Sequence, residues 1–296
     1  MPVFRVDIHQ HVFIDAQEKL AHNKVIGYTT PAESLPWTMK VAQQGIDLLN
    51  LDMVIVSYPP SCLGEISDAN RNKTRGINEY LKTNVVDQDP QRFGMFAHLP
   101  FLDDGNLTLV AGVLAEIVYA FDTLGADGVS MTACYGVGAD AKYLGHDLYD
   151  PIWAELNRRG SVVLIHGGMV PSTTPYPHEF LGVPITEVPN ETYKSAAHLV
   201  VSGRRRKYPN VKIILTHAGG VTAFLAARVA ALSNYMGCPL SPEEILEDFK
   251  TFYVDTALSG YEVTLQAVET FHSIDRVLFG SDYFGEFFLR GIRVVE

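Results

Sequence analysis

Short apolar segments alternate with longer amphipathic segments along the whole chain. Most of the apolar segments are continuous and lack the polar–apolar alternation of a half-exposed strand, as expected of parallel strands that are buried on both faces. Eight such strands are predicted, at Val3–Ile8, Met53–Ser57, Phe93–His98, Asp127–Met131, Val162–Ile165, Val211–Thr216, Phe252–Val254 and Arg276–Phe279.

Segments with apolar residues at helical spacing lie between these strands. The strand starts run from about residue 4 to residue 275, so seven intervals over 271 residues average about 39 residues, which is typical of one βα unit with insertions. The predicted helices are Pro36–Leu51, Asp68–Gln88, Leu107–Leu124, Tyr149–Arg159, Thr192–Tyr208, Gly219–Tyr235 and Gly260–His272.

Eight βα units with one crossover hand predict a TIM-type (β/α)8 barrel, formed by residues 1–296 as a single domain. A doubly wound open sheet is the main alternative, although no G-x-G-x-x-G motif follows the first strand. Insertions are expected at about residues 13–35 and 167–191. The second insertion holds five prolines, and we expect it to form a wall or lid on the upper face of the barrel or, alternatively, a stiff surface loop.

The charge balance narrows the classes of partner. The chain has 23 Lys and Arg residues against 34 Asp and Glu residues, a formal net charge of −11. This argues against a nucleic acid or an anionic membrane, because phosphate binding needs clustered Lys and Arg. No apolar run reaches the roughly 18 residues of a membrane span. The three cysteines are too few for a disulfide framework, so we expect a reducing, cytoplasmic location.

Candidate chemistry lies at the carboxyl ends of the predicted strands. His9 and His11 close the first strand, and side chains two residues apart on a strand point to the same side. His166 ends the fifth strand, His217 the sixth and Asp282 the eighth. In (β/α)8 barrels the active site lies at these strand ends. Their joint occurrence after very apolar runs predicts a site for one divalent metal ion.

These motifs resemble the metal-dependent amidohydrolase superfamily. The segments DIHQH, LIHGG, LTHAGG and LFGSDY carry the resemblance. Within the superfamily the chain is similar to the decarboxylase branch, which includes aminocarboxymuconate-semialdehyde and γ-resorcylate decarboxylases, and it looks most like the 6-methylsalicylate decarboxylase type. RFGMFAHLPF, LGADGVSM and DRVLFGSDY share that similarity, and the matching segments extend from residue 5 to residue 283.

The resemblance implies roles for individual residues. His9, His11, His166 and Asp282 correspond to the metal ligands, and His217 corresponds to the catalytic histidine beside the metal. This donor set suits Zn²⁺, with Mn²⁺ as the alternative. The lysine that bridges two metals in binuclear relatives is absent from the end of the fourth strand, so one metal ion is expected.

Arg228 lies eleven residues beyond His217 and resembles an arginine that reaches into the neighbouring subunit of the aminocarboxymuconate-type enzyme to bind the substrate carboxylate. That role predicts a homodimer, and a surface arginine is the alternative. Asp255 and His98 end two other predicted strands and are further candidates to line the site.

The leading hypothesis is a metal-dependent, non-oxidative decarboxylase of a small aromatic hydroxy acid such as 6-methylsalicylate, which the resemblance places in polyketide secondary metabolism. Asp282 is the candidate proton donor to the ring carbon, and His217 the residue that orients the substrate or moves a proton. A metal-dependent hydrolase of a lactone or amide would use the same residues. A truncated, non-catalytic paralogue is the third hypothesis, because only 296 − 282 = 14 residues follow Asp282 and the last helix of the barrel is expected to be shortened or absent.

Overall fold

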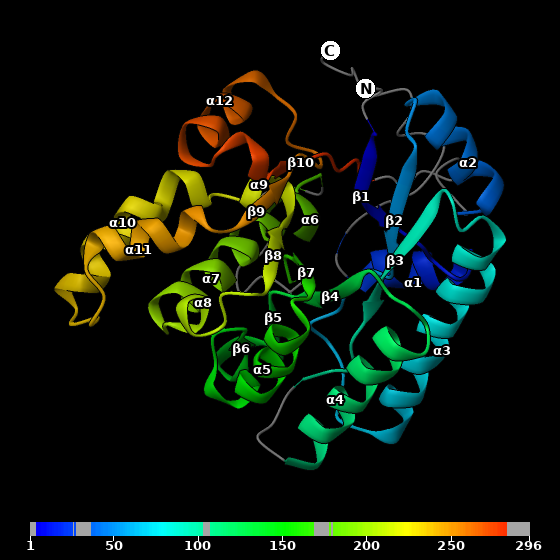
Figure 1. The fold of residues 1–296 in the computed structure, drawn as a ribbon, viewed down its shortest axis with the longest axis horizontal. Coiled ribbons are helices and arrows are strands. Elements are labelled where there is room, and N and C mark those ends of the chain that lie inside the picture. The colour runs from blue at the N-terminus through cyan, green and yellow to red at the C-terminus, as the bar shows by residue number, and fades with distance from the viewer. Residues whose placement is uncertain are drawn as a thin grey trace.

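The structure, a computed structural model, is a barrel of eight parallel strands (Figure 1). It describes residues 4–25, 27, 37–102, 107–168, 178 and 180–282. The strand order is β1–β2–β3–β4–β7–β8–β9–β10, and every pairing between neighbours is parallel. The strands are β1 (Val6–His11), β2 (Met53–Ser57), β3 (Phe93–His98), β4 (Gly128–Thr132), β7 (Val162–His166), β8 (Lys212–Leu215), β9 (Tyr253–Asp255) and β10 (Val277–Leu278).

Two backbone hydrogen bonds connect the last strand to the first. The amide of Ile8 donates to the carbonyl of Phe279 (3.0 Å), and the amide of Asp282 donates to the carbonyl of His9 (2.8 Å). An open, doubly wound sheet would leave these two edges apart. The predicted TIM-type barrel is therefore confirmed.

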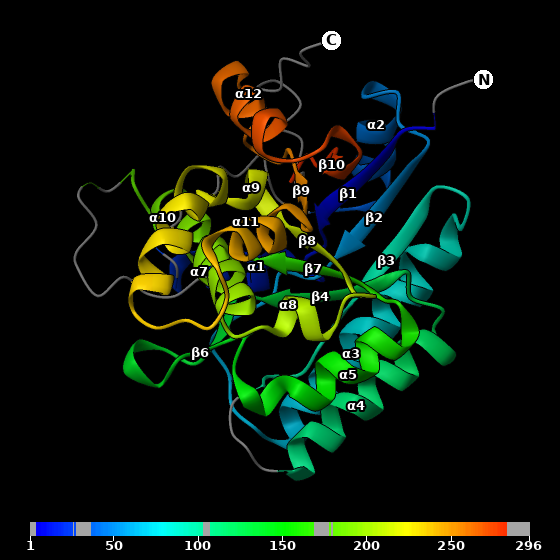
Figure 2. The ribbon, with the colours of Figure 1, turned by 60° about the vertical axis from the view of Figure 1, so that its left-hand side comes forward.

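Helices cover the outside of the barrel. Figures 1 and 2 place α2, α3 and α4 on one side of the strands and α7, α10 and α11 on the other. The longer helices are α1 (Ala16–Val25), α2 (Met39–Leu48), α3 (Asp68–Asn84), α4 (Leu107–Asp122), α5 (Asp150–Arg159), α7 (Val188–Val201), α10 (Thr222–Tyr235), α11 (Pro242–Lys250) and α12 (Glu262–Phe271). Short elements complete the described fold: α6 (Val183–Thr186), α8 (Arg204–Lys207), α9 (Thr216–Gly219) and the hairpin β5 (Cys134–Tyr135) with β6 (Lys142–Tyr143).

Several predicted boundaries were wrong, for local physical reasons. The first strand begins at Val6 and includes both histidines. The helix predicted over residues 192–208 is two helices, because Gly203 takes a left-handed conformation (φ 72°) between α7 and α8. Helix α11 was not predicted, although Ser241 and Glu244 form a capping box at its start.

The insertions are only partly described. Residues 13–35 contain helix α1, which was not predicted, and α6 lies in the second insertion. Residues 169–177 and 179 of the proline-rich segment and all residues after Asp282 lie outside the described residues, as does the prediction of a shortened last helix. Within the described part of the chain, no helix has the length and apolar character needed to cross a membrane.

The inside of the barrel is filled by two different layers of side chains. The middle layer is an apolar cluster of Ile55, Phe96, Leu164 and Ile214. The residues two positions further along the same strands form the upper layer, because alternate residues of a strand share a face. These residues are Ser57, His98, His166 and Thr216. The carboxyl ends of the strands thus carry a polar layer that rests on an apolar one.

Candidate metal centre

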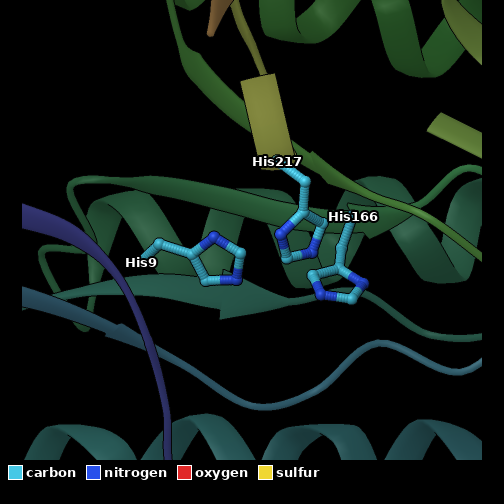
Figure 3. A group of neighbouring side chains, drawn as sticks. All are labelled: His9, His166 and His217. Carbon is cyan, nitrogen blue, oxygen red and sulfur yellow. The ribbon is translucent and has the colours of Figure 1, made fainter. Parts of the chain in front are cut away.

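Four imidazoles and one carboxylate converge in the upper layer. His9 and His11 come from β1, His166 from the end of β7, His217 from the segment after β8 and Asp282 from the segment after β10. Their nearest donor atoms lie within 4.8 Å of one another in two overlapping groups, His9–His166–His217 and His9–His11–Asp282. All five residues are buried. Figure 3 shows three of the rings pointing toward a common centre.

An irregularity in β1 aims both of its histidines inward. Asp7 pairs with Val54 and Gln10 with Val56, so one extra residue of β1 is accommodated between them. The Nε2 atoms of His9 and His11 are consequently only 3.1 Å apart.

The outer nitrogen of three of the four rings, those of His9, His166 and His217, is held by an acceptor, which fixes the tautomer. The Nδ1 atoms of His166 and His217 lie 3.0 Å and 3.2 Å from the carbonyl oxygens of Gly167 and Ala257. The Nδ1 of His9 lies 2.8 Å from the Asp255 carboxylate. Because carbonyls and carboxylates only accept, Nδ1 carries the proton in each ring and the Nε2 lone pair faces the centre.

Unshared electron pairs that face one another in a buried space repel unless a cation lies between them. The donor set of neutral imidazoles and one carboxylate therefore fits a divalent metal ion. Burial, followed by the neighbouring imidazoles, holds the pKa of His11 and His166 well below the ordinary value, so both rings are neutral as metal ligands must be.

The pKa values of His9 and Asp282, in contrast, are raised. Burial lowers the pKa of His9, but the carboxylates of Asp255 and Asp282 outweigh burial and raise it to about 9. Burial raises the pKa of Asp282, against the effect of His9 and His217. The centre thus combines His9 and Asp282, which hold their protons more tightly than usual, with His11 and His166, which hold theirs less tightly.

An unusual local backbone conformation directs Asp282 and His217 into the cluster. Asp282 and His217 have positive φ angles of 56° and 58°, which non-glycine residues rarely adopt. Asp7 fixes the segment that carries Asp282. Its carboxylate accepts hydrogen bonds from the amide and hydroxyl of Ser281 (3.1 and 2.5 Å) and from Gln10 Nε2 (2.9 Å). Positive φ angles cluster at functional sites, so this strain supports the interpretation of the cluster as a candidate site.

Comparisons with known proteins agree with this geometry. The amidohydrolase family profile matches residues 6–286 of the chain. This protein belongs to the amidohydrolase family. A 6-methylsalicylic acid decarboxylase of Penicillium expansum is 37% identical over 286 residues, which cover 94% of this chain and 84% of the relative. The predicted resemblance to the decarboxylase branch is therefore confirmed.

Solved structures of the amidohydrolase family share the fold. A dihydroxybenzoic acid decarboxylase from Polaromonas, solved with bound manganese and 2-nitroresorcinol, superposes with a TM-score of 0.80 at 20% identity, covering 100% of this chain and 92% of that one. A 2,6-dihydroxybenzoate decarboxylase in complex with 2,6-dihydroxybenzoate gives a TM-score of 0.78 at 20% identity, covering 95% and 89%.

The other candidates of this amidohydrolase lie apart from the clustered histidines and Asp282 or behind them. Arg228 is exposed on α10, away from the cluster in its own chain. Asp255 supports two of the clustered histidines, since it holds His9 Nδ1 and accepts the amide of His217 (2.8 Å). His98 lines a separate cavity of about 340 Å³ beneath α1 and α3.

Two residues that interact with the cluster were not predicted as site residues from the sequence. Ser57 lies 3.3 Å from the Nδ1 of His11. Its signal was available, because it ends a predicted strand. Lys19 is buried on α1 and interacts electrostatically with Asp282. It lay within a predicted insertion, where no pattern distinguished it.

Proposed function

We propose that this protein is a metal-dependent, non-oxidative decarboxylase of a small aromatic hydroxy acid of the 6-methylsalicylate kind. One observation carries the proposal: the buried cluster of imidazoles and Asp282 lies at the carboxyl ends of the barrel strands in a chain whose sequence relative is a 6-methylsalicylic acid decarboxylase. Structural neighbours that act on dihydroxybenzoates support an aromatic carboxylate as the class of substrate.

His9, His11, His166 and Asp282 would hold one divalent cation. Such an ion supplies Lewis acidity toward the oxygen atoms of the substrate. The imidazole-rich donor set favours Zn²⁺, and Mn²⁺ is the alternative because a structural neighbour contains it.

Asp282 supplies the proton in the proposed mechanism. Loss of CO₂ from an aromatic ring needs an electron acceptor, and protonation of the ring carbon that carries the carboxylate creates one. Asp282 donates this proton, the bond between ring and carboxylate then breaks, and its electron pair restores the aromatic ring as CO₂ leaves. Burial raises the pKa of Asp282, which suits a proton donor.

His217 orients the substrate, and after each turnover its Nε2 takes up a proton from solvent and passes it to Asp282. Its ring is fixed by the carbonyl of Ala257, and its Nε2 faces the centre. Its backbone is held by Asp255, so the ring position does not depend on the substrate.

We further propose that the protein works as a homodimer in the cytoplasm and serves secondary metabolism. The exposed face of α10 carries apolar side chains at helical spacing around Arg228, which suits a subunit interface. They are Phe224, Leu232 and Tyr235. The cysteines are free thiols, which supports a reducing compartment.

The decisive experiment measures bound metal and turnover together. Elemental analysis of the purified protein should find one Zn²⁺ or Mn²⁺ per chain, and ultraviolet absorbance should record loss of 6-methylsalicylate with release of CO₂. Asp282→Asn should abolish turnover, whereas Asp275→Asn, which changes an exposed aspartate, should not. Ring opening of a lactone without CO₂ would instead identify a hydrolase. Bound metal without any turnover would favour a non-catalytic protein.

Mixing two variants tests the dimer. Arg228→Met and His166→Ala should each be inactive alone. If Arg228 acts across the interface, mixed dimers regain activity, because about a quarter of all sites receive both intact contributions after random exchange. A monomer in sedimentation, or no recovery after exchange, would contradict the dimer proposal.

A further inference from the structure

Helix α1 buries a polar face, whereas an ordinary surface helix buries an apolar one. Lys19 and Asn23 are only 1% and 7% exposed, whereas Leu20 is 41% exposed. Lys19, His22 and Asn23 are three and four residues apart, so they share one face. A surface helix normally turns its apolar face toward the core. A local reversal of this rule is expected where function requires polar groups inside.

Electrostatic interactions link the polar inner face of α1 to the candidate metal centre. The negative charge of Asp282 acts on Lys19, and His22 interacts electrostatically with both His11 and His166. Glu18 anchors the helix at the end of β2, because the hydroxyl of Tyr58 donates to its carboxylate (2.7 Å). Tyr58 directly follows Ser57, whose hydroxyl lies 3.3 Å from His11 Nδ1, so α1 lies beside the carboxyl end of β2 with Lys19 on its buried face.

Lys19 is the one buried lysine among the residues that the structure describes. Burying an ammonium group costs several kcal/mol unless negative charge compensates it. Burial lowers the pKa of Lys19 to about 8, and Asp282 acts in the opposite direction. The Lys19 Nζ also lies 5.6 Å from the ring centre of Phe13, a position that favours a cation.

A carboxylate substrate gives this buried cation a function. Asp255 and the ionised form of Asp282 are buried carboxylates at the centre, and both would repel an anion. Arg228 is exposed on α10 and does not compensate them within its own chain. An ammonium group offers three donors to a carboxylate, which can accept from Lys19 with one oxygen while its other oxygen faces the centre.

We propose that Lys19 is a substrate-binding residue that recognises the carboxylate of the aromatic acid from the inner face of α1. This inference rests on the proposed function for the identity of the substrate. It adds a determinant of specificity that lies outside the clustered histidines and Asp282. Lys19 selects the anionic substrate over the neutral phenol that remains once CO₂ has left.

Binding of a matched pair of ligands to the metal-loaded enzyme tests this role. Salicylate carries the carboxylate, and 2-hydroxybenzyl alcohol has the same ring with a neutral group in its place. By calorimetry, Lys19→Met should weaken salicylate binding about 10- to 100-fold, the range expected for one hydrogen bond to a charged group. Binding of the neutral alcohol should change less than about twofold, because it does not depend on the charge of Lys19.

Two further variants complete the design. Lys24→Met removes an exposed lysine from the same helix and should bind both ligands like the wild type. Lys19→Arg keeps the charge and should retain more salicylate affinity than Lys19→Met. With 6-methylsalicylate as substrate, Lys19→Met should raise KM more than it lowers kcat.

Each outcome has a defined meaning. Selective loss of salicylate binding in Lys19→Met supports the proposal. Unchanged salicylate binding, or equal loss of both ligands, overturns it, since equal loss indicates that Lys19 only holds α1 in place. If the wild type binds salicylate but releases no CO₂ from 6-methylsalicylate, the proposed function fails while the binding comparison still decides the role of Lys19.

Discussion

Two neighbouring layers inside the same barrel differ completely in chemistry. On β7, Leu164 belongs to the apolar middle layer and His166, two residues later, belongs to the polar upper layer. Both side chains are buried and are separated by only about 6.5 Å along the strand. The middle layer gains stability from burial of apolar surface. The upper layer places electron pairs and charges of like sign close together.

This difference indicates that the middle layer supplies stability and the upper layer supplies function. In the described part of the upper layer, two buried polar atoms, Thr216 Oγ1 and His98 Nδ1, lack a hydrogen-bond partner. Such atoms reduce stability. The apolar layer beneath must therefore stabilise a site that would not hold itself together. Substituting single residues of each layer tests this division.

The largest effect is expected from His166→Ala. Removing one imidazole from the cluster should lower turnover of 6-methylsalicylate by at least about 1000-fold, because the metal contributes several kcal/mol of transition-state stabilisation. Bound metal, measured by elemental analysis, should fall with it. The free energy of unfolding of the metal-free protein should change by no more than about 1 kcal/mol. Full metal content in this variant would remove His166 from the ligands.

Leu164→Ala should produce the opposite pattern. The leucine is fully buried, so its truncation should lower the free energy of unfolding by about 2–5 kcal/mol in urea denaturation. Bound metal should remain at the level of the wild type. Leu48→Ala, at an exposed position on α2, is the matched control and should change stability by less than about 0.5 kcal/mol. Loss of metal in Leu164→Ala would show that the layers are not separable.

Asp255→Asn tests how a residue outside the cluster supports the upper layer. An asparagine amide facing His9 Nδ1 would favour the tautomer whose proton points from Nε2 into the centre. Metal affinity, measured by competition with a chromophoric chelator, should fall about 10- to 100-fold. Asp140→Asn changes an exposed aspartate and should have no effect. Wild-type affinity in Asp255→Asn would mean that the hydrogen bond does not set the tautomer.

The sequence predicted the upper layer well because strand ends are its strongest signal. Continuous apolar runs that stop at a histidine or aspartate identify both the strand and its exit, so His9, His11, His166, His217 and Asp282 could be grouped without a structure. The irregularity in β1 was not visible, since one extra residue in a strand leaves no mark on the pattern.

Helix α1 escaped prediction for the opposite reason. Its inward face is polar and Leu20 points outward, so the periodicity that identifies surface helices is reversed there. Arg228 is exposed on α10, and its proposed target lies in a second copy of the chain. The prediction of α1 therefore failed because this helix buries a polar face instead of an apolar one.

A buried imidazole far from the cluster provides the mildest test. His272, at the end of α12, is 2% exposed, and neither ring nitrogen has a hydrogen-bond partner among the described residues. Burial, followed by the charges of Arg276 and Lys250, lowers its pKa to about 4. Between pH 6.5 and 4 the unfolded chain therefore binds a proton that the folded protein refuses, and stability falls as the pH falls.

The size of this effect follows from the two pKa values. With about 4 in the folded state and 6.5 in the unfolded state, His272 should cost about 2 kcal/mol of stability between pH 8 and pH 5. His272→Leu should flatten the pH dependence of urea unfolding by that amount, whereas His178→Leu, at an exposed site, should leave it unchanged. If His272→Leu keeps the full acid sensitivity, the destabilisation at low pH originates in the upper layer, whose histidines would then limit both function and stability.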